Sequence, residues 1–248
     1  MTKIGWDGIE CPIRKVGVTH IKPEEAETRL PEMVEALAEQ RKVVGMVSTS
    51  ITSVDSESER LLRIIAANGI THYRIGFAHY PWNEKITETV ARFTSQMKDL
   101  SELNAELGLT GGYQNHSGKN YIGGPIWDFW MMIKDLDPAS IGFSFDIGQA
   151  MIEGGLSWPT QARLTRDRWV ALQVKDFNWT RDKKNQWKPQ WCPLGKGRLQ
   201  QQFFDDFKSS SFDGPIIQHC EHIRPGGPVD ATITGLSNDF QTLKKWLT

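Results

Sequence analysis

The stretch that decides the fold is FSFDIG, Phe143 to Gly148, near the middle of the chain. Apolar and polar residues alternate over its first four positions, which is typical of a β-strand with two different faces. Phe143 and Phe145 predict a face that packs under helices, and Ser144 and Asp146 form the opposite face. If the sheet closes into a barrel, the two polar side chains therefore face its interior.

Similar segments recur along the chain and are separated by helical patterns. Leu30, Met33, Val34 and Leu37, for example, fall at three- and four-residue steps on one helix face. Strands that alternate with helices predict βαβ units and a parallel sheet, here an α/β barrel of the TIM type. The expected strands cover about 8–13, 43–51, 71–77, 109–115, 141–147, 169–176 and 215–221, and the expected helices 24–41, 56–68, 86–107, 125–135, 157–167, 199–210 and 230–247.

The count of seven strands is one short of a closed (β/α) barrel. We expect either that the chain lacks the first strand and helix, or that residues 15–21 supply the closing strand. An open barrel exposes two strand edges, which a homodimer or an additional N-terminal segment would cover. Residues 180–200 show no clear period and predict a long loop, and the absence of a linker predicts one domain over 1–248.

Composition excludes several classes of protein. The chain has 29 Lys and Arg against 30 Asp and Glu, a net charge of -1, so it lacks the basic field that holds nucleic acid. Its apolar runs are too short to span a bilayer, and no signal-peptide pattern begins it, so we expect no membrane association. The compartment stays open, with the cytoplasm favoured. Three cysteines without paired spacing indicate neither a disulfide scaffold nor a structural zinc site.

Four consecutive strands are expected to direct polar side chains to one axis. A barrel core of branched aliphatic residues has no structural use for them, so their convergence indicates a functional site, although any one alone is more simply a hydrogen-bonded structural residue. In the strand near 169–176, Val170, Leu172 and Val174 are expected on the outer face. The inward set is Gln114 and His116, Ser144 and Asp146, Gln173 and Lys175, and His219 and Glu221.

Other features are weaker signals. Gly195-Lys196-Gly197 is too short to indicate a phosphate-binding loop, and Lys175 has a structural alternative as an ion-pair partner of Glu221 or Asp146. Most of the ten tryptophans are expected to be packing residues. Those in or beside the predicted loop, of which Trp179 is the first, are candidates for stacking on a sugar.

The motifs GWDGIE, GYQNHSG, FSFDIGQAMIEGG, QVKDFNW and PLGKG resemble the xylose-isomerase-like TIM-barrel superfamily over residues 5 to about 225. This superfamily comprises sugar phosphate isomerases and epimerases, and also the endonuclease IV type of DNA repair enzyme. The resemblance implies a barrel that begins at the second family strand. It also implies a divalent metal held by residues at the ends of four strands.

Carried over position by position, the implied metal ligands fall on Gln114, Asp146, Gln173 and Glu221, with His219 as the alternative to the last. Glutamines replace a carboxylate and an imidazole of the family pattern, which removes charge and donor strength. Whether Mn²⁺, Mg²⁺, Co²⁺ or Zn²⁺ binds is therefore left open.

The resemblance further implies proton abstraction next to a carbonyl of a small sugar, keto-sugar or polyol. Glu221 or His219 would act as the base and Lys175 would stabilise the developing oxyanion. The implied substrate contacts are Asn115, His116, Gln149 and Trp179. The alternatives are a lyase or hydratase step on an oxidised sugar and an inactive barrel that binds a carbohydrate or a partner. An endonuclease is the weakest alternative, because the chain has few histidines.

Overall fold

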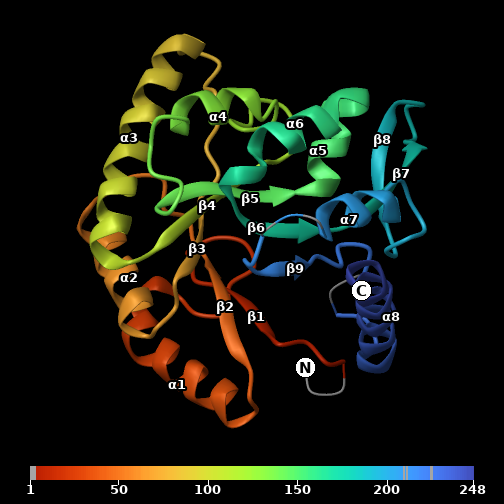
Figure 1. The fold of residues 1–248 in the computed structure, drawn as a ribbon, viewed down its shortest axis with the longest axis horizontal. Coiled ribbons are helices and arrows are strands. Elements are labelled where there is room, and N and C mark those ends of the chain that lie inside the picture. Colours follow the sequence, from red (N-terminus) through yellow and green to blue (C-terminus); the bar gives the residue numbers. More distant parts are fainter. Residues whose placement is uncertain (1–3, 209, 211, 224–225) are drawn as a thin grey trace.

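The computed structural model describes residues 4–208, 210, 212–223 and 226–248. Seven parallel strands stand in the order β1-β2-β3-β4-β5-β6-β9 and curve into a nearly closed barrel, with helices around the outside (Figure 1). This arrangement confirms the predicted α/β barrel. The strands are β1 (Gly8–Pro12), β2 (Val43–Ser48), β3 (His72–Ile75), β4 (Thr110–Gln114), β5 (Ile141–Asp146), β6 (Trp169–Val174) and β9 (Ile216–Gln218).

Helices lie on the connections between successive barrel strands, and local capping explains several of their limits. Asp55 accepts a hydrogen bond from the backbone N–H of Ser58 and starts α2, and Gly108 ends α3 with a left-handed φ of 65°. No described helix has an apolar stretch long enough to cross a membrane. The helices are α1 (Ala26–Glu39), α2 (Ser56–Ala67), α3 (Ile86–Leu107), α4 (Trp127–Ile133), α5 (Ile147–Gly154), α6 (Trp158–Thr165), α7 (Gln201–Lys208) and α8 (Val229–Leu247), with short 3₁₀ turns at Pro23–Glu25, Gly155–Ser157 and Arg166–Arg168.

Helix α5 is an element that the periodicity does not predict. Asp146 ends β5 and also caps α5, because its Oδ1 accepts a hydrogen bond of 3.0 Å from the backbone N–H of Gln149. The helix has only eight residues, too few for a helical repeat to stand out. For the helix predicted over 199–210, position 209 lies outside the described residues.

The predicted loop over 180–200 is wrong in its first half. Residues Asp176–Arg181 (β7) and Trp187–Cys192 (β8) form an antiparallel hairpin beside the barrel (Figure 1). The turn between them has Asn185 at a φ of 61°, a conformation that asparagine tolerates well. The strand predicted over 169–176 therefore divides into β6 and the start of β7.

The outward face of β5 packs as predicted, and β6 differs from the prediction at one residue. Phe145 stacks on Trp169 with 4.6 Å between ring centroids. Leu172 and Val174 belong to the main core between strands and helices. Val170 was predicted on that face, but it joins a small inner cluster with Met46 and Ala171, because a bulge between Phe143 and Ser144 shifts the register of β5 against β6.

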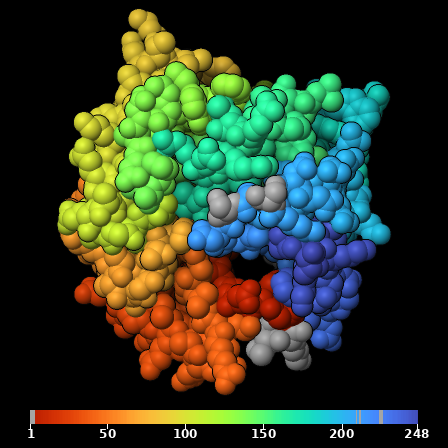
Figure 2. Space-filling view, in the orientation of Figure 1, coloured from red at the N-terminus to blue at the C-terminus, as the bar shows by residue number. Residues whose placement is uncertain are grey.

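The barrel has a seam between β1 and β9. Among the described residues these strands share no backbone pairing, and the space-filling view has a hollow between the red and blue segments there (Figure 2). A side-chain bond of 3.1 Å from Trp6 Nε1 to Gln218 Oε1 connects the two edges. Residues 15–21 do not supply the closing strand, because Ile21 makes only an isolated bridge to Ile13, on the chain just after β1.

The Pro193–Gly197 loop wraps a carboxylate of the protein itself. Asp176 is 1% exposed and accepts hydrogen bonds of 2.8–3.0 Å from the backbone N–H groups of Phe177, Gly195, Gly197 and Leu199. A side chain at Gly197 would overlap Asp176 Oδ1, which explains the second glycine of the GKG motif. This buried anion site fixes the segment that follows the hairpin.

Replacing Asp176 by Asn should lower the free energy of unfolding by about 3 kcal/mol, because two N–H groups would then face an NH₂ donor in a buried site. Urea denaturation measures the change. The matched control is Asp205→Asn, since the Asp205 side chain is 46% exposed on α7, and it should change stability by less than about 0.5 kcal/mol. Equal effects of the two substitutions would contradict the anchoring role.

Candidate functional site

Charged and amide side chains meet at the carboxyl ends of the parallel strands. They come from most of the strands around the barrel, and hydrogen bonds or ion pairs link them into one network, here named the polar ring. The convergence expected from β4, β5, β6 and β9 is therefore present. The polar ring consists of Glu10, Arg74, Gln114, Asp146, Lys175, His219 and Glu221.

Asp146 is the most constrained carboxylate of the ring. It is fully buried, and its Oδ1 caps α5 through the N–H of Gln149. Its Oδ2 accepts a bond of 2.7 Å from Gln114 Nε2 and lies 3.1 Å from Lys175 Nζ. Both oxygens are thus engaged, and these contacts fix the orientation of the carboxylate and of its neighbours.

Lys175 lies between two carboxylates. Its Nζ donates to Glu221 Oε1 at 2.7 Å in addition to its ion pair with Asp146. The ammonium also sits over the Trp191 ring of β8, 4.4 Å from the centroid. The lysine side chain is only 2% exposed, whereas that of Glu221 is 43% exposed. Glu221 is therefore the ring carboxylate most accessible to a ligand.

On the opposite side of the ring, Glu10 connects Arg74 and His219. Its Oε2 lies 3.2 Å from His219 Nε2, and its Oε1 lies 3.3 Å from Arg74 Nε and accepts a bond from the Ser48 hydroxyl. Burial by itself raises the pKa of Glu10, but the His219 hydrogen bond and the Arg74 charge outweigh it and lower the pKa to about 2. Arg74 Nη1 also donates to Gln114 Oε1.

Glu10 and Arg74 are site residues that the sequence reasoning missed. Arg74 is a charged residue between Tyr73 and Ile75 in a four-residue strand, and it is 7% exposed. A charged residue between Tyr73 and Ile75 in so short a strand was the available signal, since buried arginines require partners. Glu10 lies in the GWDGIE motif on β1, but the alternation of faces was applied only to later strands.

Two predicted substrate contacts, Asn115 and Gln149, are engaged in holding the mouth together. Asn115 donates to the backbone carbonyl of Asp146 at 2.9 Å and accepts from its N–H at 2.8 Å. Gln149 Oε1 accepts from the backbone N–H of Ser117 at 3.1 Å and from its hydroxyl. Both residues are about 1% exposed, so their contact with a substrate stays a prediction.

His116 lies beside the ring, in an aromatic setting. Its ring is 4.6 Å from that of Tyr121 and 5.0 Å from that of Phe77, between centroids, and its Nδ1 lies 2.7 Å from the carbonyl oxygen of Ser117. Burial lowers the pKa of His116, and the nearby Lys175 charge lowers it further. The imidazole is therefore neutral near pH 7.

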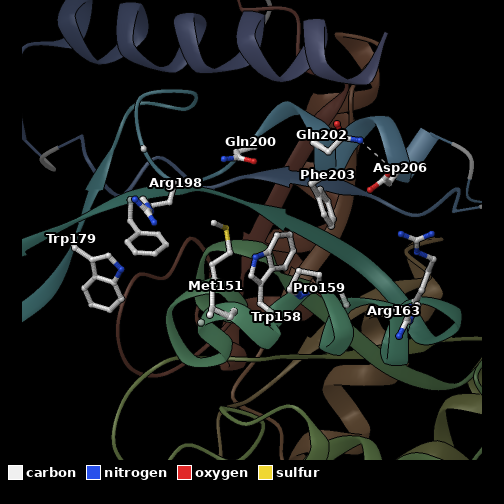
Figure 3. Close-up of a pocket in the computed structure, with 16 residues that line it drawn as sticks. Met151, Trp158, Pro159, Arg163, Trp179, Arg198, Gln200, Gln202, Phe203 and Asp206 are labelled. Carbon is white, nitrogen blue, oxygen red and sulfur yellow. Dashed lines mark hydrogen bonds between the residues drawn. The ribbon is translucent and has the colours of Figure 1, made fainter.

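Trp179 lies outside the polar ring. With Arg198 it stands at one end of a cavity of about 970 Å³ that α5, α6 and α7 complete (Figure 3). Figure 3 places Trp158 and Phe203 in its centre and Arg163 at the far end. None of the described residues that line this cavity belongs to the polar ring. The structure therefore does not bring Trp179 together with Lys175 and Glu221.

The four residues that the family likeness implies as metal ligands do not fit a divalent cation, because most of their side-chain oxygens are already bound. Gln114 and Asp146 use their oxygens within the ring, and Glu221 Oε1 is bound to Lys175. Gln173 donates to Ser144 Oγ at 2.7 Å and keeps only Oε1 without a partner among the described residues. In the part of the chain described, no three His, Cys, Asp or Glu side chains group as a metal site. The implied ligand oxygens of Gln114, Asp146 and Glu221 instead contact the cationic side chains of Arg74 and Lys175.

Comparison with solved structures gives the same architecture at low sequence identity. A xylose isomerase-like TIM-barrel protein from Mycobacterium smegmatis, in complex with magnesium, is 16% identical with a TM-score of 0.70, covering 100% of this chain and 87% of that one. The 3-keto-D-glucoside 4-epimerase of E. coli is 14% identical, with a TM-score of 0.69 over 95% and 89% of the chains. A probable 3-DHS dehydratase from Bacillus anthracis is 12% identical, with a TM-score of 0.68 over 98% and 90%.

A comparison with curated proteins gives no match. The family model described as xylose isomerase-like TIM barrel matches residues 1–244, nearly the whole chain. The seven parallel strands and the polar ring at their carboxyl ends agree with that match. The chain therefore belongs to the xylose isomerase-like TIM-barrel family.

Proposed function

We propose that this protein is a sugar isomerase or epimerase that removes a proton next to the carbonyl of a small sugar, keto-sugar or polyol. The observation that carries the proposal is the pair of Lys175 and Glu221 at the barrel mouth, an ammonium 2.7 Å from a partly exposed carboxylate. Proton abstraction next to a carbonyl needs a base beside a group that stabilises negative charge on oxygen. Solved structures of similar fold include two named as sugar epimerases, acting on a 3-keto-glucoside and on D-psicose.

Glu221 is the proposed base. Its carboxylate takes the proton from the carbon next to the carbonyl, and the C–H electron pair moves into the carbon framework to form an enediolate. Lys175 donates a hydrogen bond to the oxygen that gains the charge, and Asp146 holds the ammonium from the other side at 3.1 Å. Return of the proton to the neighbouring carbon on the same face, together with transfer of the hydroxyl proton from one enediolate oxygen to the other, interconverts an aldose and a ketose with one base.

The pair of His219 and Glu10 is the proposed second proton-transfer group. Inverting one carbon requires a proton donor on the face opposite the base, which a single carboxylate cannot supply. His219 Nε2 is 3.2 Å from Glu10, and an ionised carboxylate at that position stabilises an imidazolium. An epimerase would use this pair together with Glu221. Glu221 would act as the base in one direction of the reaction, and His219 would act as the base in the other.

Gln173 Oε1 is the proposed acceptor for a substrate hydroxyl. The side chain is fully buried, and among the described residues this oxygen has no hydrogen-bond partner. A buried acceptor without a partner costs free energy that a hydroxyl donor of a ligand would recover. Asn115, His116 and Gln149 would shape the surrounding wall. Trp179 lines the separate cavity and is not part of this proposed contact set.

A dehydratase is the second candidate, because one structural neighbour is named as a probable dehydratase. Elimination begins with the same proton removal by Glu221 and ends with departure of a hydroxyl group, which His219 would protonate. The two reactions therefore share their first step and differ in the product.

The first step can be measured directly by incubating the protein with a panel of keto-sugars in D₂O. Loss of the C–H signal next to the carbonyl in the proton NMR spectrum reports proton abstraction, whether the outcome is isomerisation, epimerisation or elimination. We expect exchange with at least one small sugar. No exchange and no product across the panel, with saturable sugar binding, would instead identify an inactive carbohydrate-binding barrel.

Replacing Glu221 by Gln should reduce the exchange rate by about 10²–10⁴-fold, the usual contribution of a positioned base. Glu35→Gln, on the exposed surface of α1, is the control and should leave the rate unchanged. Both variants should keep the wild-type melting temperature within a few degrees. A rate for Glu221→Gln within threefold of wild type would exclude Glu221 as the base.

The low pKa of Glu10 predicts a pH-dependent contribution to stability. With the folded pKa near 2 and an ordinary value of 4.5, the contribution is complete above pH 4.5 and is lost as the pH falls toward 2. It amounts to roughly 3 kcal/mol at neutral pH. Urea unfolding of Glu10→Gln should therefore differ from wild type more at pH 7 than at pH 3. A difference that does not depend on pH would refute the ionised pairing.

A further inference from the structure

Lys175 lies where the family likeness implies a metal ion. Its Nζ is 3.1 Å from Asp146 Oδ2 and 2.7 Å from Glu221 Oε1, the two carboxylates among the implied ligand positions. An ammonium at these distances supplies a positive charge and three directed N–H donors at the same point. It can therefore attract a substrate oxygen as a bound cation would.

The surroundings of Lys175 hold the ammonium in this position. A Cβ on Gly148 would approach Lys175 Cγ to 2.9 Å, so the glycine leaves space for the lysine stem against α5. The Trp191 ring covers the ammonium at 4.4 Å, and the side chain is 2% exposed. Packing on both sides therefore disfavours a swing of Lys175 out of the ring.

Arg74 engages a further potential metal ligand, the side-chain oxygen of Gln114. Its guanidinium lies 3.3 Å from Glu10 Oε1 and donates to Gln114 Oε1, the oxygen that would otherwise coordinate a cation. The ring thus balances the three carboxylates of Glu10, Asp146 and Glu221 with two resident cations and His219. A divalent ion would have to displace Lys175 and leave its charge buried without a partner, which is strongly unfavourable.

We propose that Lys175 is the resident cation of this site and excludes a divalent metal from it. For its catalytic part the inference rests on the proposed function: the ammonium polarises the substrate carbonyl without a metal ion. Its metal-exclusion part stands on the ring geometry alone. The two parts are therefore tested separately.

The metal-exclusion part is tested by titrating chelator-treated protein with Mn²⁺ and following free Mn²⁺ by electron paramagnetic resonance. We expect no saturable binding to wild type up to about 1 mM, and binding at least tenfold tighter to Lys175→Met, which releases the two carboxylates from Lys175 and leaves them beside the unpartnered Gln173 Oε1. Lys98→Met, with a side chain 65% exposed on α3, is the control and should bind no better than wild type.

Two results would overturn the metal-exclusion part. One is wild-type binding of Mn²⁺ below about 100 µM that Asp146→Asn abolishes; the other is a Lys175→Met variant that binds no better than wild type. Gly148→Ala is a second variant that displaces the lysine stem and keeps every donor. If Lys175→Met does not fold, Gly148→Ala takes its place in the test and should bind Mn²⁺ more tightly than wild type.

The catalytic part is tested by deuterium exchange of wild type with chelator present. Exchange should persist unchanged, and exchange that is lost with chelator and restored by Mn²⁺ would overturn the inference while leaving the proposed function intact. Conversely, absence of exchange under all conditions, with the Mn²⁺ results as expected, would refute the proposed function and leave the cation assignment standing.

Discussion

The ion pairs of Lys175 with Asp146 and Glu221 are the constraint on which the site depends. A buried ammonium is tolerated only with charged partners, and here the partners lie on β5 and just after β9, on either side of β6. Asp146 is itself fixed by the start of α5 and by Gln114. The same contacts therefore fix the relative positions of three adjacent βα units and bring together the groups proposed to act at their ends.

The β7–β8 hairpin and the Pro193–Gly197 loop, which is bound to Asp176, support these ion pairs from outside the barrel. Asp176 follows Lys175 directly and fixes the segment after β8 through three backbone N–H groups. The hairpin places Trp191 over the ammonium. The buried Asp176 carboxylate thereby fixes the segments that cover the ammonium, and the adjacent residue, Lys175, carries that ammonium.

The alternation of polar and apolar residues predicted the barrel and five of the seven residues of the polar ring, for physical reasons that can be stated. Alternation on β5 and β6 placed Asp146, Gln173 and Lys175 inside, because residues two apart on a strand share a face. It could not foresee the bulge that turns Val170 inward, since bulges leave no periodic trace. Glu10 and Arg74 were missed because their significance lies in contacts between β1, β3 and β9, which are distant in sequence.

A crystal structure with a sugar hydroxamate, which mimics the enediolate, is the most direct test of the central claim. The account predicts the hydroxamate oxygens within about 3 Å of Lys175 Nζ, with the carbon chain facing Glu221 and no metal between them. A hydroxamate bound elsewhere, such as in the cavity beside Trp158, or bound through a metal ion that displaces Lys175, would contradict it.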